Sequence, residues 1–281
     1  MATSWTTGLF ALLGLISTFV SLSDLLDTTL PIQWRILISL FILVLVWSLF
    51  FFFCSIFFLF KHRIEIFEVS NGYHVFVQYG DIFSENEVLK PYERRNIVIP
   101  VNRCFDTIVD DDLISSNTLH GIAMRKLYSS NRYNEETLNV EIQNNIHRQH
   151  IEPEIIQRKD KCSGNLKRFP VGTVAEVKDT DICTYFFLGL STFDSDLHAH
   201  TSDKEYVLAL MKLLEFCNTR SQKYPVVMPL IGAGASETKK SERDILDYLI
   251  GLIKMNKSLI NCDFHIIIRD SGRGSIPITN L

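Results

Sequence analysis

Two long apolar runs open the chain, and shorter apolar and polar stretches alternate through the remainder. Residues 5–23 and residues 36–60 contain no charged side chain. As helices they would be roughly 28 and 37 Å long, against a hydrocarbon core of about 30 Å. The pattern therefore predicts a hairpin of two transmembrane helices, over about 5–23 and 36–60, joined by a polar turn that contains Pro31.

The first run does not fit a signal peptide, which has a basic start and a small-residue cleavage site. Residues 1–8 hold no Lys or Arg, and no such site precedes Asp24. Lys61, His62 and Arg63 directly follow the second run, and the positive-inside rule places them in the cytoplasm. Two spans then leave the N- and C-termini cytoplasmic, which predicts a multi-pass protein.

Charged residues are concentrated after the two runs. Residues 61–281 hold 27 of the 28 cations and 30 of the 32 acids. Their nearly balanced charge, without a basic run, argues against nucleic acid as a partner. The six cysteines form no CxxC pair, which is typical of reduced thiols in the cytoplasm.

Strand and helix patterns alternate through this second portion. Runs of alternating polarity flank Asn71-Gly72, which predicts a β-hairpin over 64–69 and 73–79. A capping box formed by Ser202 and Glu205 predicts the start of a helix. Other strands are predicted at 96–101, 172–177, 182–190, 225–231 and 263–268, and other helices at 113–128 and 241–255. This alternation predicts a three-layer α/β domain over residues 64–281.

One segment interrupts the alternation. Residues 129–168 are rich in Asn, Glu, Arg and Gln and offer few apolar side chains. We therefore expect a polar surface insertion that contains some helix and has no role in the core.

The most informative motif is a buried strand that leads into a turn of small residues and then a helix. Backbone N–H groups in such a turn bind phosphate oxygens, and the following helix adds its positive end. A plain strand-to-helix turn fits equally well, and the motif is neither a P-loop nor GxGxxG. The turn consists of Gly232, Ala233, Gly234, Ala235 and Ser236.

Two other predicted strands end in polar residues. Asp81, in Gly80-Asp81-Ile82, can accept a hydrogen bond from an exocyclic amine, or it can cap a turn. Asn102 ends the strand at 96–101, where α/β sheets bind ligands. It can bridge two ribose hydroxyls or form an Asx turn.

The order of these motifs resembles that of a macro domain. The Gly-Asp-Ile turn, the strand ending in Asn102, the apolar strand after Gly172-Thr173 and the turn at 232–236 together cover residues 64–281. With the two N-terminal helices, the chain resembles the membrane-anchored macro-domain effectors of bacterial Thoeris anti-phage defence systems. The resemblance implies a three-layer macro domain with a central mixed sheet, preceded by a transmembrane hairpin at 1–60.

The resemblance also implies a ligand. Asp81 and Ile82 would hold adenine, Asn102 would lie near the distal ribose, and residues 232–236 would wrap the diphosphate. The ligand would be an ADP-ribose derivative, histidine-ADP-ribose in the version with membrane helices, made from NAD by a partner TIR protein. Homo-oligomerisation would then disrupt the bacterial inner membrane and cause abortive infection.

One departure from the macro pattern bears on catalysis. Hydrolytic macro domains follow the Asn with a glycine-rich loop, whereas residues 103–112 contain no glycine. This favours a ligand-binding effector, and a membrane-tethered ADP-ribosyl hydrolase or a passive membrane anchor are the alternatives. Asp110, Asp111 and Asp112 either bind a cationic group at the ligand's distal end or form a solvated loop.

Other candidates for chemistry are incomplete. The pairs His147/His150 and His198/His200 have the spacing of metal ligands, but no pattern completes a tetrahedral site. No Ser or Cys has the His and acid neighbours of a catalytic set. Arg269, after the last strand, either lines a pocket or forms a surface ion pair with Asp270. We expect no catalytic residue, no metal and no resident cofactor.

Overall fold

The chain divides into two compact units, Met1–His62 with Pro277–Leu281, and Arg63–Ile276. The structure is a computed structural model, and it describes residues 7–11, 14, 31–59, 62–69, 71–90, 93–232, 241–278 and 281.

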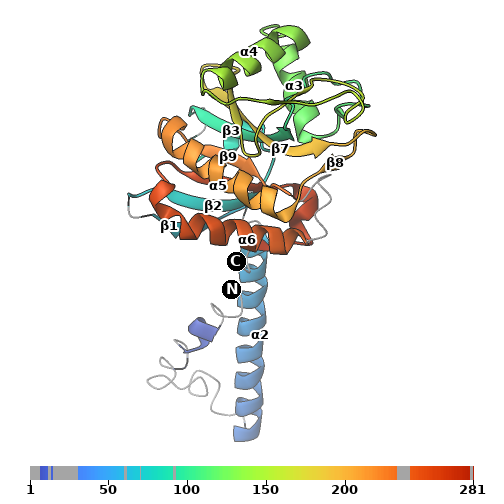
Figure 1. The fold of residues 1–281 in the computed structure, drawn as a ribbon. Helices are drawn as coiled ribbons and strands as arrows, with labels where there is room; N and C mark the ends of the chain where they lie inside the picture. The colour runs from blue at the N-terminus through green and yellow to red at the C-terminus, as the bar shows by residue number, and fades with distance from the viewer. Residues whose placement is uncertain are drawn as a thin grey trace. The chain divides into compact units, whose positions relative to one another are not determined.

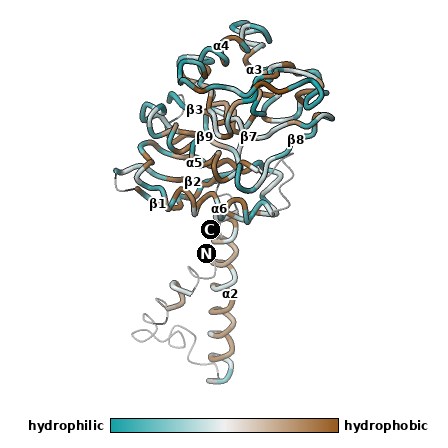
Figure 2. Tube along the Cα trace, viewed as in Figure 1, coloured by the Kyte–Doolittle hydropathy of each residue, from teal (hydrophilic) through white to brown (hydrophobic). Residues whose placement is uncertain are grey.

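The first unit contains a long apolar helix, α2 (Ile32–Leu59) (Figure 1). Its segment Ile36–Ile56 has a mean hydropathy of 2.9, and Figure 2 shows it as predominantly hydrophobic. Large side chains such as Phe41 and Phe53 are exposed along it. Within the described residues, this is the one helix long and apolar enough to span a membrane.

The predicted hairpin and multi-pass arrangement gain no support from this unit. Of the first predicted helix, at 5–23, the structure describes residues 7–11 and 14, which are helical, and the other positions lie outside the described residues. What the described residues support is a single candidate span.

The second unit is built on a mixed sheet (Figure 1). The strands have the order β1-β2-β10-β9-β3-β7-β6, and β8 pairs with β7 beyond this path. From β2 to β7 neighbouring strands run parallel, whereas β1 and β6 are antiparallel to their neighbours. The strands are β1 (Arg63–Glu68), β2 (His74–Tyr79), β3 (Arg95–Asn102), β6 (Val174–Lys178), β7 (Cys183–Phe193), β8 (Ala199–His200), β9 (Val226–Pro229) and β10 (Phe264–Ile268).

Helices cover both faces of this sheet. Successive residues of a strand point to opposite faces. In β7, Phe187 joins the core under α3 (Leu119–Ser129) and α4 (Glu135–His147), whereas Phe186 meets Phe216 of α5 (Asp203–Arg220) at 5.1 Å between ring centroids. On that second face α6 (Glu242–Met255) lies beside α5, with Tyr248 and Tyr206 6.1 Å apart. The predicted three-layer α/β architecture is confirmed.

Several local predictions are confirmed as well. Gly72 has a φ of +77°, the left-handed conformation that the turn between β1 and β2 requires. The side chain of Ser202 accepts a hydrogen bond from the Glu205 N–H, and the Glu205 carboxylate accepts one from the Ser202 N–H, which completes the capping box.

The helix predicted at 113–128 begins six residues late, at Leu119. The Thr118 side chain accepts a hydrogen bond from the Gly121 N–H and caps the helix there. Leu113 and Ile114 are buried in the preceding loop. Their apolar character reflects burial of a loop, which periodicity alone does not separate from a helix.

The prediction that residues 129–168 have no core role is wrong. In α4, Leu138, Ile142 and Ile146 are fully buried and belong to the main core cluster. They are four residues apart, so one apolar side chain per turn suffices to dock an otherwise polar helix. The segment also holds a small antiparallel sheet formed by β4 (Glu154–Ile155) and β5 (Lys167–Arg168).

Truncation of α4 tests its role in the core. Ile142→Ala removes a fully buried side chain and should lower the free energy of unfolding by about 2–5 kcal/mol. Chemical denaturation of the detergent-solubilised protein, followed by circular dichroism, measures the loss. Val140→Ala is the matched control, because Val140 is 52% exposed on the same helix. Equal effects of the two substitutions would contradict a core role for this face.

Candidate functional site

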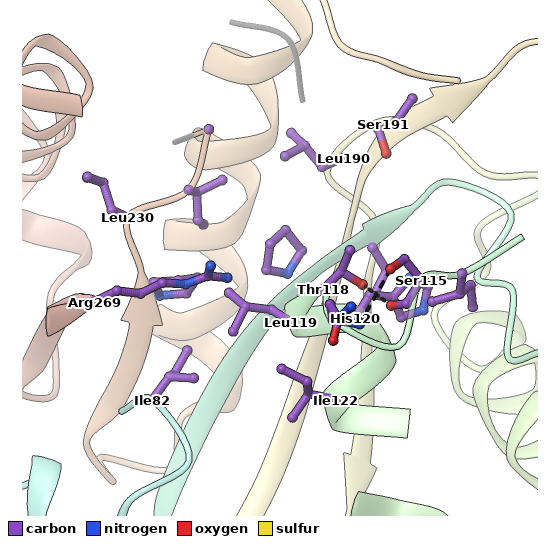
Figure 3. Close-up of a pocket in the computed structure, with 18 of the residues that line it drawn as sticks. Ile82, Ser115, Thr118, Leu119, His120, Ile122, Leu190, Ser191, Leu230 and Arg269 are labelled. Atoms are coloured by element: carbon purple, nitrogen blue, oxygen red, sulfur yellow. Dashed lines mark hydrogen bonds between the residues drawn. The ribbon is translucent and has the colours of Figure 1, made fainter. Parts of the chain in front are cut away.

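A cavity of about 1000 Å³ opens where the parallel strands of the sheet end. Residues after β2, β9 and β10 and residues at the ends of β3 and β7 line it. In Figure 3, Arg269 extends into the space between Ile82 and Leu230, and Thr118, Leu119 and His120 lie across the cavity from it. This is the position where open α/β sheets bind ligands, beyond the carboxyl ends of their strands.

The structure brings four of the predicted site residues into this one cavity: Asp81, Ile82, Asn102 and Gly232. Gly232 has a φ of +93°, and a Cβ there would lie 3.0 Å from the Tyr206 ring, so only glycine fits. The other four predicted residues, Ala233, Gly234, Ala235 and Ser236, lie outside the described residues.

Asn102 carries a buried amide whose Nδ2 interacts with the Asp106 carboxylate but makes no hydrogen bond of standard geometry to the described residues. Asn102 is 3% exposed, and its Oδ1 accepts a hydrogen bond of 3.0 Å from the Cys104 N–H, which forms the predicted Asx turn. A buried donor without a well-formed hydrogen bond costs about 1–3 kcal/mol, which a ligand oxygen in the cavity would recover.

The pairing of β3 with β7 explains where this side chain points. The register is regular from Arg95↔Cys183 to Val101↔Gly189 and then shifts, so that Asn102 pairs with Ser191. The extra residue is a bulge on β7, and both Leu190 and Ser191 line the cavity. Bulges re-aim side chains at the ends of strands, as this one does beside Asn102.

The turn that contains Asp81 rests on a buried polar network. The Asp81 Oδ1 accepts a hydrogen bond of 3.0 Å from the Phe83 N–H, which is the turn-capping role that the sequence left open. Beneath it, the Glu87 carboxylate accepts hydrogen bonds from the Asp81 N–H and from Gln78 Nε2. A Cβ on Gly80 would meet this carboxylate, so a larger residue there would displace the Glu87 side chain. Burial raises the pKa of Glu87.

His265 completes this network. Its Nδ1–H donates to Gln78 Oε1 at 3.0 Å, and its ring stacks on Phe76 at 4.9 Å. Burial, with the nearby Arg63 charge, lowers the pKa of His265 to about 3. The imidazole is therefore neutral in the folded protein near neutral pH.

The acidic loop is exposed and closed by hydrogen bonds to its own carboxylates, and its predicted contact with a cationic group stays a prediction. Asp110 Oδ1 accepts from the Leu113 N–H at 2.7 Å, and Asp111 Oδ1 accepts from the Ser116 N–H at the same distance. The hydrogen bonds from Ser116 lower the pKa of Asp111. These contacts shape the loop, while the exposed Asp111 and Asp112 also line the cavity.

Sequence reasoning missed the first turn of α3 as part of the site. Thr118, Leu119 and His120 line the cavity there. The His120 Nε2–H donates to the Asp106 carbonyl at 3.0 Å, and burial lowers the pKa of His120 to about 4. The available signal was Thr118, which as an N-cap residue marks the true start of α3. The helix predicted at 113–128 began too early, so Thr118 was treated as an interior residue.

Arg269 was weighed from the sequence with a surface ion pair as the alternative. It lines the cavity, and Asp270 pairs instead with Arg273 at 2.9 Å. Arg269 directly follows β10, as Asp81 and Asn102 follow or end their own strands. The strand-end position is the feature that the three share.

The described histidines of the cavity contact neither a hydroxyl nor a thiol. His120 donates to a carbonyl, and His198 lies 3.7 Å from Asp194. Asp194, Asp196 and His198 have potential metal-ligand atoms within 4.8 Å of one another. The Asp194 carboxylate accepts hydrogen bonds from the Asp196 and His198 N–H groups, so its Oδ1 already closes a turn. The absence of a metal stays a prediction.

A mixed sheet between two helical layers, with the Asp-Ile turn and the Asn on strand ends around one cavity, is the arrangement of a macro domain. The family described as "Thoeris protein ThsA, Macro domain" matches residues 75–269, which is more than half of the chain. The chain belongs to this family, which confirms the macro-domain and Thoeris resemblances.

Individual proteins are similar to this chain to different degrees. The Thoeris protein ThsA of Bacillus amyloliquefaciens (strain Y2) is 28% identical over 235 residues, which are 83% of this chain and 71% of that protein. Two solved structures of an Oceanobacillus iheyensis macrodomain are each 11% identical. The structure with ADP has a TM-score of 0.47 and covers 76% of this chain and 92% of its own. The structure with MES has a TM-score of 0.48 and covers 76% and 91%.

The pKa of His265 predicts how stability depends on pH. Its pKa is about 3 in the folded protein and about 6.5 in the unfolded chain, so the unfolded state binds the proton first as pH falls. The stability that the neutral imidazole confers is complete above pH 6.5 and is lost between pH 6.5 and about 3. At pH 5.5 the loss is about 1.4 kcal/mol.

His265→Gln should remove this term. The difference in unfolding free energy between pH 7.5 and 5.5 should be smaller in the variant by about 1.4 kcal/mol. Denaturation at the two pH values measures it, and each protein serves as its own reference at pH 7.5. An unchanged pH dependence in the variant would show that folding does not lower the pKa of His265.

Proposed function

We propose that the chain is a membrane-anchored Thoeris effector whose macro domain binds an ADP-ribose derivative. The observation that carries the proposal is the strand-end cavity, where Asp81, Ile82 and Gly232 meet the Nδ2 donor of Asn102. Membership of the Thoeris macro-domain family supports a role in anti-phage defence. In this role, a partner TIR protein makes the signal from NAD.

Each part of an ADP-ribose core has a partner in the cavity. The exposed carboxylate of Asp81 would accept a hydrogen bond from the exocyclic amine of adenine, and the buried Ile82 would contact the ring. Gly232 begins the turn that would wrap the diphosphate with Ala233, Gly234, Ala235 and Ser236, and the Arg269 cation would face its charge. The Nδ2 of Asn102 would donate to a hydroxyl of the distal ribose.

The distal end of the cavity favours a ligand with a cationic group. Asp111 and Asp112 line it with two carboxylates, and neutral His120 adds no opposing charge. An imidazole attached to the distal ribose would meet these acids. We therefore propose histidine-ADP-ribose as the signal.

Binding without turnover fits the site better than hydrolysis does. The loop after Asn102 has no glycine, and His120 is held on a carbonyl, away from the role of a base. A membrane-tethered ADP-ribosyl hydrolase is the alternative, and it requires release of product from an ADP-ribose conjugate.

The effector would act on the membrane. In this proposal α2 and residues 5–23 form a two-helix hairpin in the lipid bilayer of the bacterial inner membrane, with both termini cytoplasmic. Ligand drives assembly only if it binds the assembled state more tightly. Homo-oligomers formed in this way would disrupt the membrane and cause abortive infection.

Substitution of Asn102 tests the site. Asn102→Asp keeps the oxygen that accepts from the Cys104 N–H and removes the Nδ2 donor. The dissociation constant for ADP-ribose, measured by calorimetry on the detergent-solubilised protein, should rise about tenfold to a hundredfold. Without ligand, the melting temperature should fall, because the substitution buries a carboxyl group beside Asp106, so binding is measured well below that temperature.

The control measurement and the test for hydrolysis use the same detergent-solubilised protein. Asn144→Ala, on the exposed surface of α4, should leave the affinity unchanged. Chromatography of histidine-ADP-ribose after incubation should recover it intact. Rapid hydrolysis by the wild-type protein would contradict the effector proposal and favour the hydrolase alternative. If the protein bound no nucleotide at all, the passive membrane anchor would be the remaining hypothesis.

Membrane disruption should depend on the signal. Cells that express the protein with its TIR partner should lose membrane potential on infection, and cells that express it alone should keep it. A potential-sensitive dye reports the change, and cells carrying Asn102→Asp should stay polarised. Depolarisation without the TIR partner would contradict ligand control.

A further inference from the structure

A buried ion pair joins the polar segment 129–168 to the loop that follows Asn102. Lys161 Nζ lies 2.6 Å from Asp106 Oδ2, and each side chain is 1% exposed. The second oxygen of Asp106 accepts from the Asn165 N–H at 2.6 Å, and Lys161 also donates to the Asn165 carbonyl at 3.0 Å. A buried pair of this kind adds little net stability, because desolvation of the two charges offsets their attraction. We therefore consider its effect on the geometry of the two segments that it joins.

The ion pair is part of a larger clamp on the same loop. Asn165 Nδ2 donates to the carbonyls of Cys104 and Phe105, both at 3.2 Å. Gly164 has a φ of +76°, and a Cβ there would collide with the Asp106 carboxylate. Residues 161–165 and residues 104–106 therefore fit together closely enough to require glycine at one of their contacts.

This clamp lies behind residues that line the cavity. The Asp106 carbonyl holds the His120 ring through the 3.0 Å hydrogen bond. Lys161 Nζ also lies 5.8 Å from the centre of the Phe193 ring, at the end of β7. His120 and Phe193 both line the cavity, so Lys161 supports its wall from two sides without reaching the ligand space itself.

The order of the sheet confines this support to one half of the cavity. Asp81 and Arg269 extend from the adjacent strands β2 and β10, and Gly232 follows β9 in the middle. Asn102 and Phe193 come from β3 and β7, on the other side of β9. The clamp touches the β3–β7 half and none of the residues of the β2–β10 half.

We propose that Lys161, through its buried contact with Asp106, is a positioning residue that shapes the half of the cavity beyond the diphosphate. It thereby sets the affinity for the distal ribose and any group attached to it, and it leaves the adenine half unchanged. This inference rests on the proposed function, because it assumes that an ADP-ribose core spans the two halves.

The affinities for two nucleotides report on the two halves of the cavity separately. ADP carries the adenine and the diphosphate, and ADP-ribose adds the distal ribose. In the full-length protein in detergent, Lys161→Met should raise the dissociation constant for ADP-ribose at least tenfold and change that for ADP less than twofold. A general loss of structure would weaken both nucleotides alike, so the ratio distinguishes positioning from folding.

Lys178→Met is the matched control, because Lys178 forms an exposed ion pair of 2.7 Å with Asp181. It should change neither dissociation constant. If Lys161→Met does not fold, Asn165→Ala takes its place, since it removes the amide contacts of the clamp from a half-buried position. Its expected effect is smaller and has the same selectivity for ADP-ribose.

The outcomes are distinct. Equal weakening of ADP and ADP-ribose, or no weakening of either, overturns the role of Lys161 while the proposed function stands. Failure of the wild-type protein to bind either nucleotide overturns the proposed function and this inference together.

Discussion

The parallel alignment of β2, β10, β9, β3 and β7 is the constraint on which the candidate site depends. Parallel strands end at the same edge of a sheet, so five loops that are far apart in the sequence meet there. Asp81 and Arg269 are 188 positions apart, and they line one cavity because β2 and β10 pair in parallel. The bulge at Asn102 and Ser191 then adjusts the direction of one side chain within this frame.

Each half of the cavity rests on its own buried polar network. Gln78, Glu87 and His265 lie under the turn at Asp81, and Lys161, Asp106 and Asn165 lie behind the loop after Asn102. Buried polar groups destabilise a protein unless they are hydrogen-bonded, so each network favours the one geometry in which its hydrogen bonds form.

The sequence predicts the elements and several strand-end residues because those signals are local. Asn71-Gly72 marks the first turn, Ser202 and Glu205 mark a helix start, and polar residues after apolar runs mark Asp81 and Asn102. Burial of Leu138, Ile142 and Ile146 was missed because three apolar residues in a polar segment give little average signal. Pairing of Lys161 with Asp106, across 55 positions, depends on tertiary packing that no local pattern carries.

One contact relates the β2–β10 half of the cavity to the start of the domain. Arg63, the first residue of β1, donates through Nε to Gln78 Oε1 at 2.7 Å and through its guanidinium to the Glu87 carbonyl at 2.9 Å. Glu87 in turn holds the Asp81 N–H. The side chains that hold the turn at Asp81 thus also hold the residue at which the domain begins, four positions after the last residue of α2. Contact alone does not couple the cavity to Arg63. A ligand that binds two arrangements of this network with equal affinity would not change the equilibrium between them. A ligand that favours one arrangement would act on the turn and on Arg63 together, through the side chains of Glu87 and Gln78 that join them.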